Sequence, residues 1–151
     1  MKYFFSIAII VLFFSACQSI DVYENFTSFK EHSWKNTENP CFTFNISDTN
    51  SQYNFYFVLR NEDAYSYKNI WLDIKIKEPD TTISIRREFI LADNKKWLGT
   101  AMDDIIEHRI PFNTAPTKLK KGKYEFTISQ IMREDPLPHI LAAGIRVQKI
   151  H

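Results

Sequence analysis

Strict alternation of apolar and polar side chains is the pattern that most constrains how this chain can fold. It is clearest over residues 70–77, where aliphatic residues hold every second position from Ile70 to Ile76. Successive side chains of a strand point to opposite faces of a sheet, so this period predicts a half-buried β-strand. The same alternation recurs over residues 52–60, 82–91, 106–112, 124–132 and 144–150, and residues 41–46 form a short run rich in β-formers.

No stretch beyond residue 16 keeps a 3.6-residue period for three turns. Short strands that each have one apolar face, separated by turn signals such as Glu78-Pro79-Asp80-Thr81, are typical of two packed antiparallel sheets. The predicted fold class is therefore all-β, an antiparallel β-sandwich. Immunoglobulin-like and jelly-roll topologies both fit this strand pattern.

The N-terminus has the pattern of a bacterial lipoprotein signal peptide. Lys2 precedes an uncharged apolar run over residues 3–14, and Ser15-Ala16-Cys17 follows. The run is short for a membrane-spanning helix, which needs roughly 20 residues. We expect cleavage after residue 16 and acylation of Cys17, although Phe14 stands where such motifs usually carry leucine. An ordinary signal peptide and an uncleaved anchor are the alternatives.

The sequence has 2 cysteines, Cys17 and Cys41. If Cys17 is acylated, Cys41 has no disulfide partner in the chain, and an exported domain must then be held together by its apolar core. Cys41 stands beside Phe42 and Phe44 and is predicted to be a small buried hydrophobe.

The charges are balanced, with 19 Lys+Arg and 18 Asp+Glu, and the signal peptide contains Lys2 but no acid. This balance excludes electrostatic attraction to nucleic acid or to lipid headgroups as a driving force. Membrane attachment is therefore assigned to the acyl chains at Cys17. No small-molecule substrate is expected.

The mostly polar segment from Cys17 to Pro40 is interpreted as a tether followed by a segment at the domain edge. Its isolated aromatics argue against a wholly disordered linker, and Phe29 and Trp34 are expected to pack onto the domain. The predicted organisation is a signal peptide over residues 1–16, the lipidated cysteine with tether and edge segment over 17–40, and the sandwich over 41–151.

Features that usually carry enzymatic chemistry are sparse. The 3 glycines lie far apart, which argues against phosphate-binding loops, and neither a G-x-S-x-G nor an H-E-x-x-H motif occurs. Asp103, Asp104, Glu107 and His108 are the one group that suggests a metal, but a strand would point Glu107 and His108 to opposite faces. A solvated turn is the favoured interpretation, and no catalytic, cofactor-binding or metal site is predicted.

Four aromatic residues, Tyr65, Tyr67, Trp71 and Trp97, are expected in loops or on the strand face opposite the aliphatic residues. Exposed aromatics either pack locally or anchor protein interfaces, so these four are the candidate interface residues. Exposed tryptophans on a sandwich also allow a carbohydrate-binding module as an alternative function.

Three blocks of the sequence resemble the GldH-type gliding motility lipoprotein family of Bacteroidota. They are YNFYFVLRNEDAYSYKNIWL, WLGTAMDDIIEHRIPF and GKYEFTISQIMREDPLPHILAAGIRVQK. The most specific pieces are Trp97-Leu98-Gly99, Asp104-Ile105 and the segment from Ile128 to Arg133. Ala101 and Met102 depart from the glycine that many members carry after Trp-Leu-Gly-Thr.

The resemblance implies a non-enzymatic lipoprotein of the cell envelope, needed for gliding and for the associated type IX secretion machinery. It implies contacts with other envelope proteins of that machinery, at the outer membrane. Residues 18–21 contain one acid and no dense acidic run, which favours the periplasmic side. A surface carbohydrate-binding lipoprotein, and a hydrolase using Asp103, Asp104, Glu107 or His108, are the competing hypotheses.

Overall fold

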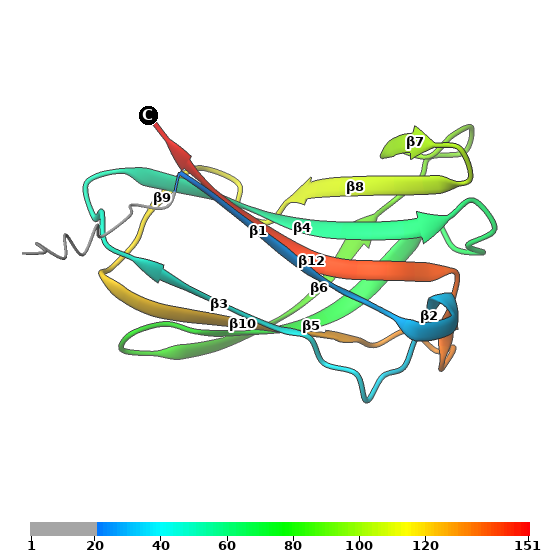
Figure 1. The fold of residues 1–151 in the computed structure, drawn as a ribbon, viewed down its shortest axis with the longest axis horizontal. Coiled ribbons are helices and arrows are strands. Elements are labelled where there is room, and N and C mark those ends of the chain that lie inside the picture. Colours follow the sequence, from blue (N-terminus) through cyan, green and yellow to red (C-terminus); the bar gives the residue numbers. More distant parts are fainter. Residues whose placement is uncertain (1–20) are drawn as a thin grey trace, which may run out of the picture.

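Two antiparallel sheets form the domain in the computed structural model, which describes residues 21–151; Cys17 and the predicted signal peptide over residues 1–16 lie outside this range. Figure 1 shows the sheets as two layers. The six-stranded sheet contains β1 (Val22–Ser28), β12 (Ile140–Ile150), β4 (Gln52–Glu62), β8 (Ile105–Pro111) and β7 (Thr100–Met102), with β9 (Thr117–Lys118) paired to β4. The four-stranded sheet contains β3 (Cys41–Ile46), β10 (Gly122–Gln130), β5 (Asn69–Lys77) and β6 (Thr82–Ile90). A short pair, β2 (Ser33–Trp34) with β11 (Leu137–Pro138), and the 3-10 turn η1 (Lys30–His32) complete the described elements.

The strand order is that of a jelly roll. One layer runs β1-β12-β4-β8, and the other runs β3-β10-β5-β6. The long strands that follow one another in the chain mostly change sheet, and β5 with β6 is the one hairpin among them. In an immunoglobulin fold the first two strands belong to the same sheet, whereas β1 and β3 lie in opposite sheets here. The predicted antiparallel sandwich is confirmed, and its topology is the jelly-roll alternative.

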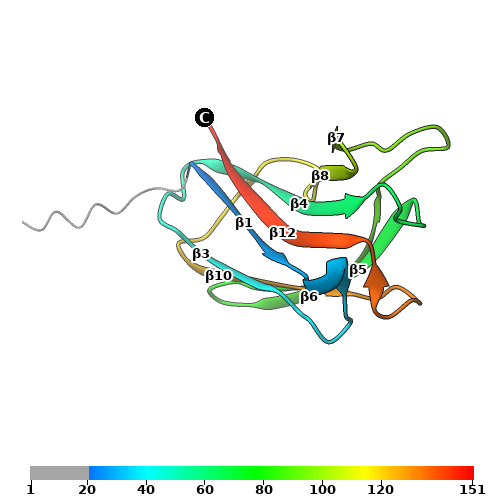
Figure 2. The same ribbon diagram turned by 45° about the vertical axis from the view of Figure 1, so that its right-hand side comes forward.

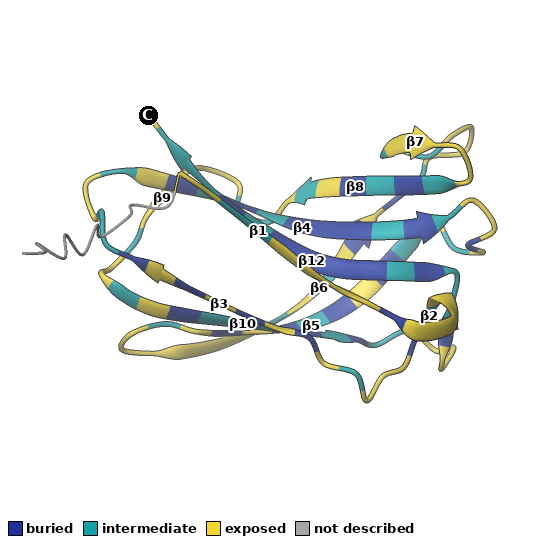
Figure 3. Ribbon diagram, viewed as in Figure 1, coloured by how far each residue is buried: buried dark blue, intermediate teal, exposed yellow. Residues whose placement is uncertain are grey.

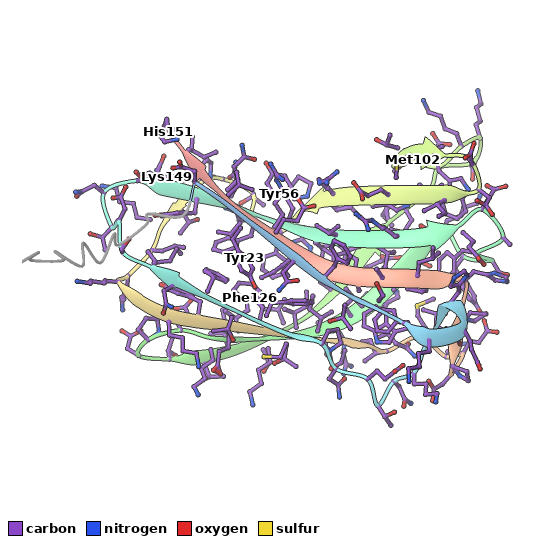
Figure 4. All side chains as sticks on the ribbon, in the orientation of Figure 1. Tyr23, Tyr56, Met102, Phe126, Lys149 and His151 are labelled. Atoms are coloured by element: carbon purple, nitrogen blue, oxygen red, sulfur yellow. The ribbon has the colours of Figure 1, made fainter. Side chains whose placement is uncertain are left out.

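The alternation in the sequence identifies the core. Every second residue of β4 and β5 is buried, and these side chains meet those of the facing sheet between the layers (Figures 3 and 4). Ring pairs join the two sheets: Phe57 of β4 lies 4.8 Å from Phe89 of β6, and Phe55 lies 5.5 Å from Phe126 of β10. With no disulfide among the described residues, this aromatic layer is the main source of stability.

The N-terminal boundary of the sandwich is earlier than predicted. Residues 22–28 form β1, which pairs with β12 from Val22 opposite Gln148 to Ser28 opposite Ala142. Trp34 is fully buried and stacks on Phe29 with ring centroids 4.8 Å apart. The predicted start at residue 41 is therefore wrong. The alternation did not reveal β1 because Asn25 and Thr27, which share a strand face with Tyr23, are polar and exposed at the sheet edge, so the strand lacks an apolar face.

Cys41 is exposed, so its prediction as a buried residue is wrong. The period of β3 explains why: Phe42, Phe44 and Ile46 are buried, and the residues between them point to the solvent side. Cys41 takes the parity of Thr43 and does not share a face with its phenylalanine neighbours.

Two further strands differ in extent from their predictions. β12 begins at Ile140 rather than at residue 144, because the small residues Ala142, Ala143 and Gly144 gave no visible alternation. In β6 the predicted inner face is buried at Phe89, but Ile83 is 40% exposed because β6 is the edge strand. None of the helical segments within residues 21–151 has the length and apolarity needed to cross a bilayer.

Candidate functional site

The candidate interface residues gather at one end of the sandwich. The described chain begins at residue 21 at the left of Figure 1, where the C-terminus also lies; Figure 4 labels Lys149 and His151 there and Met102 at the opposite end. That opposite end, called the distal end below, consists of residues 29–40, 62–68, 91–104 and 131–139 (Figures 1 and 2). The distal end is thus remote from the point where the predicted anchor enters the domain.

Three of the four candidate aromatics form one cluster at the distal end. The ring of Tyr65 lies 5.6 Å from that of Tyr67, edge to face, and 6.4 Å from that of Trp97. Tyr65 is only 4% exposed and its hydroxyl donates to the carbonyl oxygen of Asn69 at 3.0 Å. The expectation that Tyr65 is exposed is therefore wrong, and burial raises the pKa of its hydroxyl. It supports the two outer rings from beneath.

Trp97 lies in the loop over residues 91–99 and is partly exposed. Its indole Nε1 donates to Oδ1 of Asp63 at 2.6 Å, and the edge of its ring approaches the His108 ring at 6.2 Å. These two contacts fix the ring orientation against the end of β4 and the start of β8. The exposed surface of the ring is thereby held in one orientation.

A hollow of about 350 Å³ borders Trp97, and its lining carries three lysines together with Asp63 and Asp93. Its lining includes Tyr67, Lys68, Lys95 and Lys96. Oδ1 of Asp93 accepts the backbone N–H groups of Lys95 and Lys96 at 2.7 and 2.8 Å, which closes the turn and lowers the pKa of Asp93. Within residues 21–151 the ammonium groups of Lys95 and Lys96 form no ion pair.

Trp71 lies apart from this cluster. It projects from the outer face of β5, is 39% exposed, and borders a second hollow of about 280 Å³ with Met132 and Arg133. Tyr67 borders both hollows, and its hydroxyl donates to Oε2 of Glu134 at 2.8 Å. The structure therefore brings Tyr65, Tyr67 and Trp97 together and places Trp71 on the adjoining sheet face.

The residues that carry the family resemblance build this end of the domain. A Cβ atom at Gly99 would lie 2.5 Å from the carbonyl oxygen of Glu107, so the Trp-Leu-Gly loop can pack on β8 only with glycine there. The carbonyl oxygen of Asp104 accepts the N–H of Asp63 at 2.7 Å. Buried Gln130 accepts the N–H of Met132 at 2.8 Å. Each of these contacts shapes a distal loop.

The acidic group weighed as a metal site does not converge. Glu107 forms an ion pair with Arg60 at 2.7 Å and another with Arg109, on the outer face of the sheet. His108 points inward and is buried, and its Nε2 lies 2.9 Å from Oδ1 of Asn61. The side chains of Glu107 and His108 therefore point apart, as the strand period requires. No set of three potential ligands that could hold a metal ion occurs in residues 21–151.

His108 makes folding sensitive to acid. Burial lowers its pKa from 6.5 to about 4. The unfolded chain binds a proton below pH 6.5 and the folded chain does not, so stability is present above that pH and is lost as the pH falls towards 4. We expect a loss of about 3 kcal/mol over this range. Urea unfolding at several pH values should show a flatter pH dependence between 6.5 and 4 for His108→Gln than for the wild type; parallel profiles would contradict this assignment.

A second polar cluster was not visible in the sequence. Oε1 and Oε2 of Glu62, at the end of β4, lie 2.5 Å from Nδ1 of His32 and Nδ1 of His139, respectively. These hydrogen bonds, with that to His139 the stronger influence, lower the pKa of Glu62. His32 and His139 both adopt positive φ, of 48° and 64°. The cluster holds η1 and the turn before β12 against the end of β4. Its three residues lie far apart in the sequence, so no local pattern predicted it.

The class of protein defined by these observations is an all-β jelly-roll domain with an aromatic and basic loop end and an N-terminal lipoprotein motif. A family model described as GldH lipoprotein matches residues 21–147. The chain belongs to the GldH lipoprotein family, which places it in the cell envelope as a membrane-anchored protein.

Two relatives are named for gliding motility. The gliding motility lipoprotein GldH homolog of Christiangramia forsetii is 28% identical over 148 residues, which cover 92% of this chain and 90% of the relative. The gliding motility lipoprotein GldH of Flavobacterium johnsoniae is 25% identical over 152 residues, which cover 95% of this chain and 92% of the relative. The family expected from the sequence blocks is confirmed.

The chain has only weak similarity to two solved structures. Dimeric latent PorU from Porphyromonas gingivalis matches 89% of this chain and 13% of its own length, at a TM-score of 0.39 and 10% identity. The VP2 subviral particle of infectious bursal disease virus matches 88% of this chain and 31% of its own length, at a TM-score of 0.35 and 16% identity. Similarities at this level carry no argument about function.

Proposed function

We propose that this protein is a lipid-anchored accessory component of the gliding motility and type IX secretion machinery, acting through contacts with other envelope proteins. The observation that carries the proposal is membership in the GldH lipoprotein family. The relatives named for gliding motility support it, since they align with more than nine-tenths of this chain. We assign the anchor to acylated Cys17 and the protein contact to the distal end.

The surface chemistry of the distal end supports a protein as the partner. Trp97 offers an oriented, partly exposed ring, and Leu98 beside it is 54% exposed. Lys95 and Lys96 place positive charge beside these apolar side chains. An apolar anchor inside a charged rim is the usual arrangement of a protein interface, so the partner surface is expected to carry carboxylates around an apolar pocket.

The position of the anchor supports the same orientation. Cys17 lies shortly before the described chain, which enters the sandwich at the end opposite Trp97. A protein held at that end presents its distal loops away from the bilayer, where envelope proteins are within reach. We place the anchor in the outer membrane and favour its periplasmic side, because residues 18–21 lack a dense acidic run.

A charge-reversal experiment tests the proposal. Deletion of the gene is expected to abolish surface spreading and export of type IX substrates. Complementation with a Lys95→Glu, Lys96→Glu variant should restore neither, because two repulsive contacts replace attractive ones, while the protein accumulates at wild-type level. The matched control is Lys118→Glu, Lys121→Glu, which reverses two exposed charges at the other end and should complement fully. Normal spreading and export in the deletion strain would refute the proposed function.

The anchor is tested separately. Replacing Cys17 with alanine removes the thiol that would be acylated, so incorporation of labelled palmitate and retention in the membrane fraction should both be lost. The sandwich should keep its wild-type unfolding midpoint, because the described domain begins after this residue. Palmitate labelling that persists in Cys17→Ala would contradict the lipoprotein assignment.

A further inference from the structure

The outer face of the four-stranded sheet is organised in rows of polar side chains. Strand register places Thr127 of β10, Lys75 of β5 and Ser84 of β6 directly beside one another. The next row towards the distal end contains Ser129, Asp73 and Arg86. Side chains opposite each other in such rows lie about 5 Å apart, so the two rows form one continuous polar surface.

This surface is hollowed. A depression of about 500 Å³ lies over the two rows, and Asn39 from the loop before β3 forms part of its border. Asp73 and Arg86 face each other inside it in a two-point ion pair, with separations of 2.9 and 3.2 Å. The remaining polar groups surround that pair.

Four side chains in the hollow are available for a ligand. Within residues 21–151, Lys75, Ser84, Thr127 and Ser129 take part in no side-chain hydrogen bond, and Lys75 in no ion pair. Three hydroxyl groups and one ammonium group therefore point towards solvent from a shared depression. Hydroxyls both donate and accept, whereas the ammonium group only donates.

On the outer face of the six-stranded sheet, by contrast, the charged side chains form ion pairs with one another. There Glu24 forms ion pairs with Arg109 at 2.9 Å and with Arg146 at 2.8 Å. Glu107 completes the network by its pairs with Arg60 and Arg109. These three arginines and two glutamates are all engaged in ion pairs with one another, unlike Lys75 on the four-stranded sheet.

Trp71 extends the same surface. It stands two residues before Asp73 on the outward side of β5, opposite Glu88 of β6, and belongs to the row of side chains that follows the hollow towards the distal end. On the far side of Trp71 is the hollow bordered by Met132 and Arg133. Arg133 forms no ion pair within residues 21–151. An exposed indole thus lies between two hollows, each with one unpaired cation.

We propose that this face, defined by Lys75, Ser84, Thr127, Ser129 and Trp71, binds an acidic polysaccharide. The apolar face of a sugar ring would pack on the indole of Trp71, and its hydroxyls would exchange hydrogen bonds with the serine and threonine side chains. A carboxylate on the neighbouring sugar would meet Lys75, and one on the opposite side would meet Arg133. Lys75 and Trp71 are four residues apart on one strand, about 13 Å, which requires a ligand longer than a single sugar.

The chemistry favours a glycan over other polymers. A nucleic acid would need a dense basic surface, but the two hollows contribute only single free cations and the chain is nearly neutral. A docking protein would need a large apolar side chain at the centre of its interface. Apart from Ile74 and Ile85, which belong to the inward-facing positions of β5 and β6, the side chains lining the large hollow are hydroxyl, amide and charged groups. A polyol with spaced carboxylates matches both the hydroxyl rows and the spacing of the cations around one aromatic ring.

Titration calorimetry on the full-length lipoprotein in detergent tests this inference. The probes are oligomers of galacturonate and of mannuronate, and their methyl-esterified forms keep the sugar rings but lack the negative charge. The wild type is expected to bind the acidic oligomers. Trp71→Ala should weaken binding about tenfold or more, as loss of a central aromatic contact does. Lys75→Ala should weaken it by about threefold to fivefold, as loss of an exposed charge pair does.

Matched variants separate a site from general charge attraction. Lys121→Ala removes an equally exposed lysine at the other end and should leave affinity unchanged. No binding of either acidic oligomer by the wild type would overturn the proposal, as would equal affinity for the esterified oligomers. It would also be overturned if Lys121→Ala and Lys75→Ala weaken binding equally while Trp71→Ala has no effect. Circular dichroism spectra identical to the wild type establish that each variant is folded.

Discussion

Replacing Trp34 with alanine is expected to lower the free energy of unfolding by about 3–5 kcal/mol. Trp34 is fully buried, stacks on Phe29 at 4.8 Å, and donates from Nε1 to the carbonyl oxygen of Glu38 at 2.7 Å. The substitution leaves a cavity beneath Phe29 and leaves the carbonyl group of Glu38 without its indole donor. Chemical denaturation followed by near-ultraviolet circular dichroism measures the loss.

Phe26→Ala is the control for that substitution. Phe26 belongs to the same N-terminal segment but is 38% exposed, and its main contact is with the guanidinium of Arg60, 4.2 Å from the ring centroid. A loss of about 1 kcal/mol or less is expected. Equal, small losses for both variants would mean that residues 22–40 are a tether after all and would contradict their place in the core.

Gly144→Ala is the second change with a large expected effect. A Cβ atom there would lie 2.2 Å from the carbonyl oxygen of Asn25 and 2.7 Å from Cα of Phe26, both in β1. Backbone atoms cannot yield as a flexible side chain does, so β1 must move away from β12. Overpacking of this kind costs about 1–3 kcal/mol, and we expect the upper end of that range because a whole strand pair is displaced.

Hydrogen exchange measures the displacement of β1 residue by residue. Amide groups of β1 should lose protection in Gly144→Ala well before those of β4 and β5. Gln148→Ala, on the same strand and with a half-exposed side chain, should change stability by no more than about 0.5 kcal/mol. Unaltered protection of β1 in Gly144→Ala would show that the close approach of the two strands is not required for folding.

The strands that could be predicted from the sequence are those whose two faces differ in chemistry. β4 and β5 alternate so regularly that their buried residues follow from the period alone. Strand β1 could not be predicted because Asn25 and Thr27, on the same strand face as Tyr23, are polar and exposed at the sheet edge. The start of β12 could not be predicted because Ala142 to Gly144 have side chains too small to distinguish an apolar face. The choice of jelly-roll topology depends on pairing between distant strands, which the period of a single strand does not encode.

Only those features of the candidate site that depend on local sequence could be predicted. Tyr67, Trp71 and Trp97 could be recognised as aromatics outside the apolar faces, but the burial of Tyr65 depends on loops that meet only in the fold. The His32–Glu62–His139 cluster joins residues that no local pattern relates. The polar rows over β10, β5 and β6 follow from register and could not be assembled from the separate strands.

Site-specific photo-crosslinking in native envelopes tests the central claim, that the distal loops contact other envelope proteins while the opposite end faces the anchor. A photoreactive residue is introduced in place of Leu98, at the exposed tip beside Trp97, and in a second strain in place of Lys121 at the opposite end. The account predicts a discrete crosslinked envelope protein at position 98, reduced by the Lys95→Glu, Lys96→Glu changes, and none at position 121. Crosslinking at position 121 with none at position 98 would contradict it.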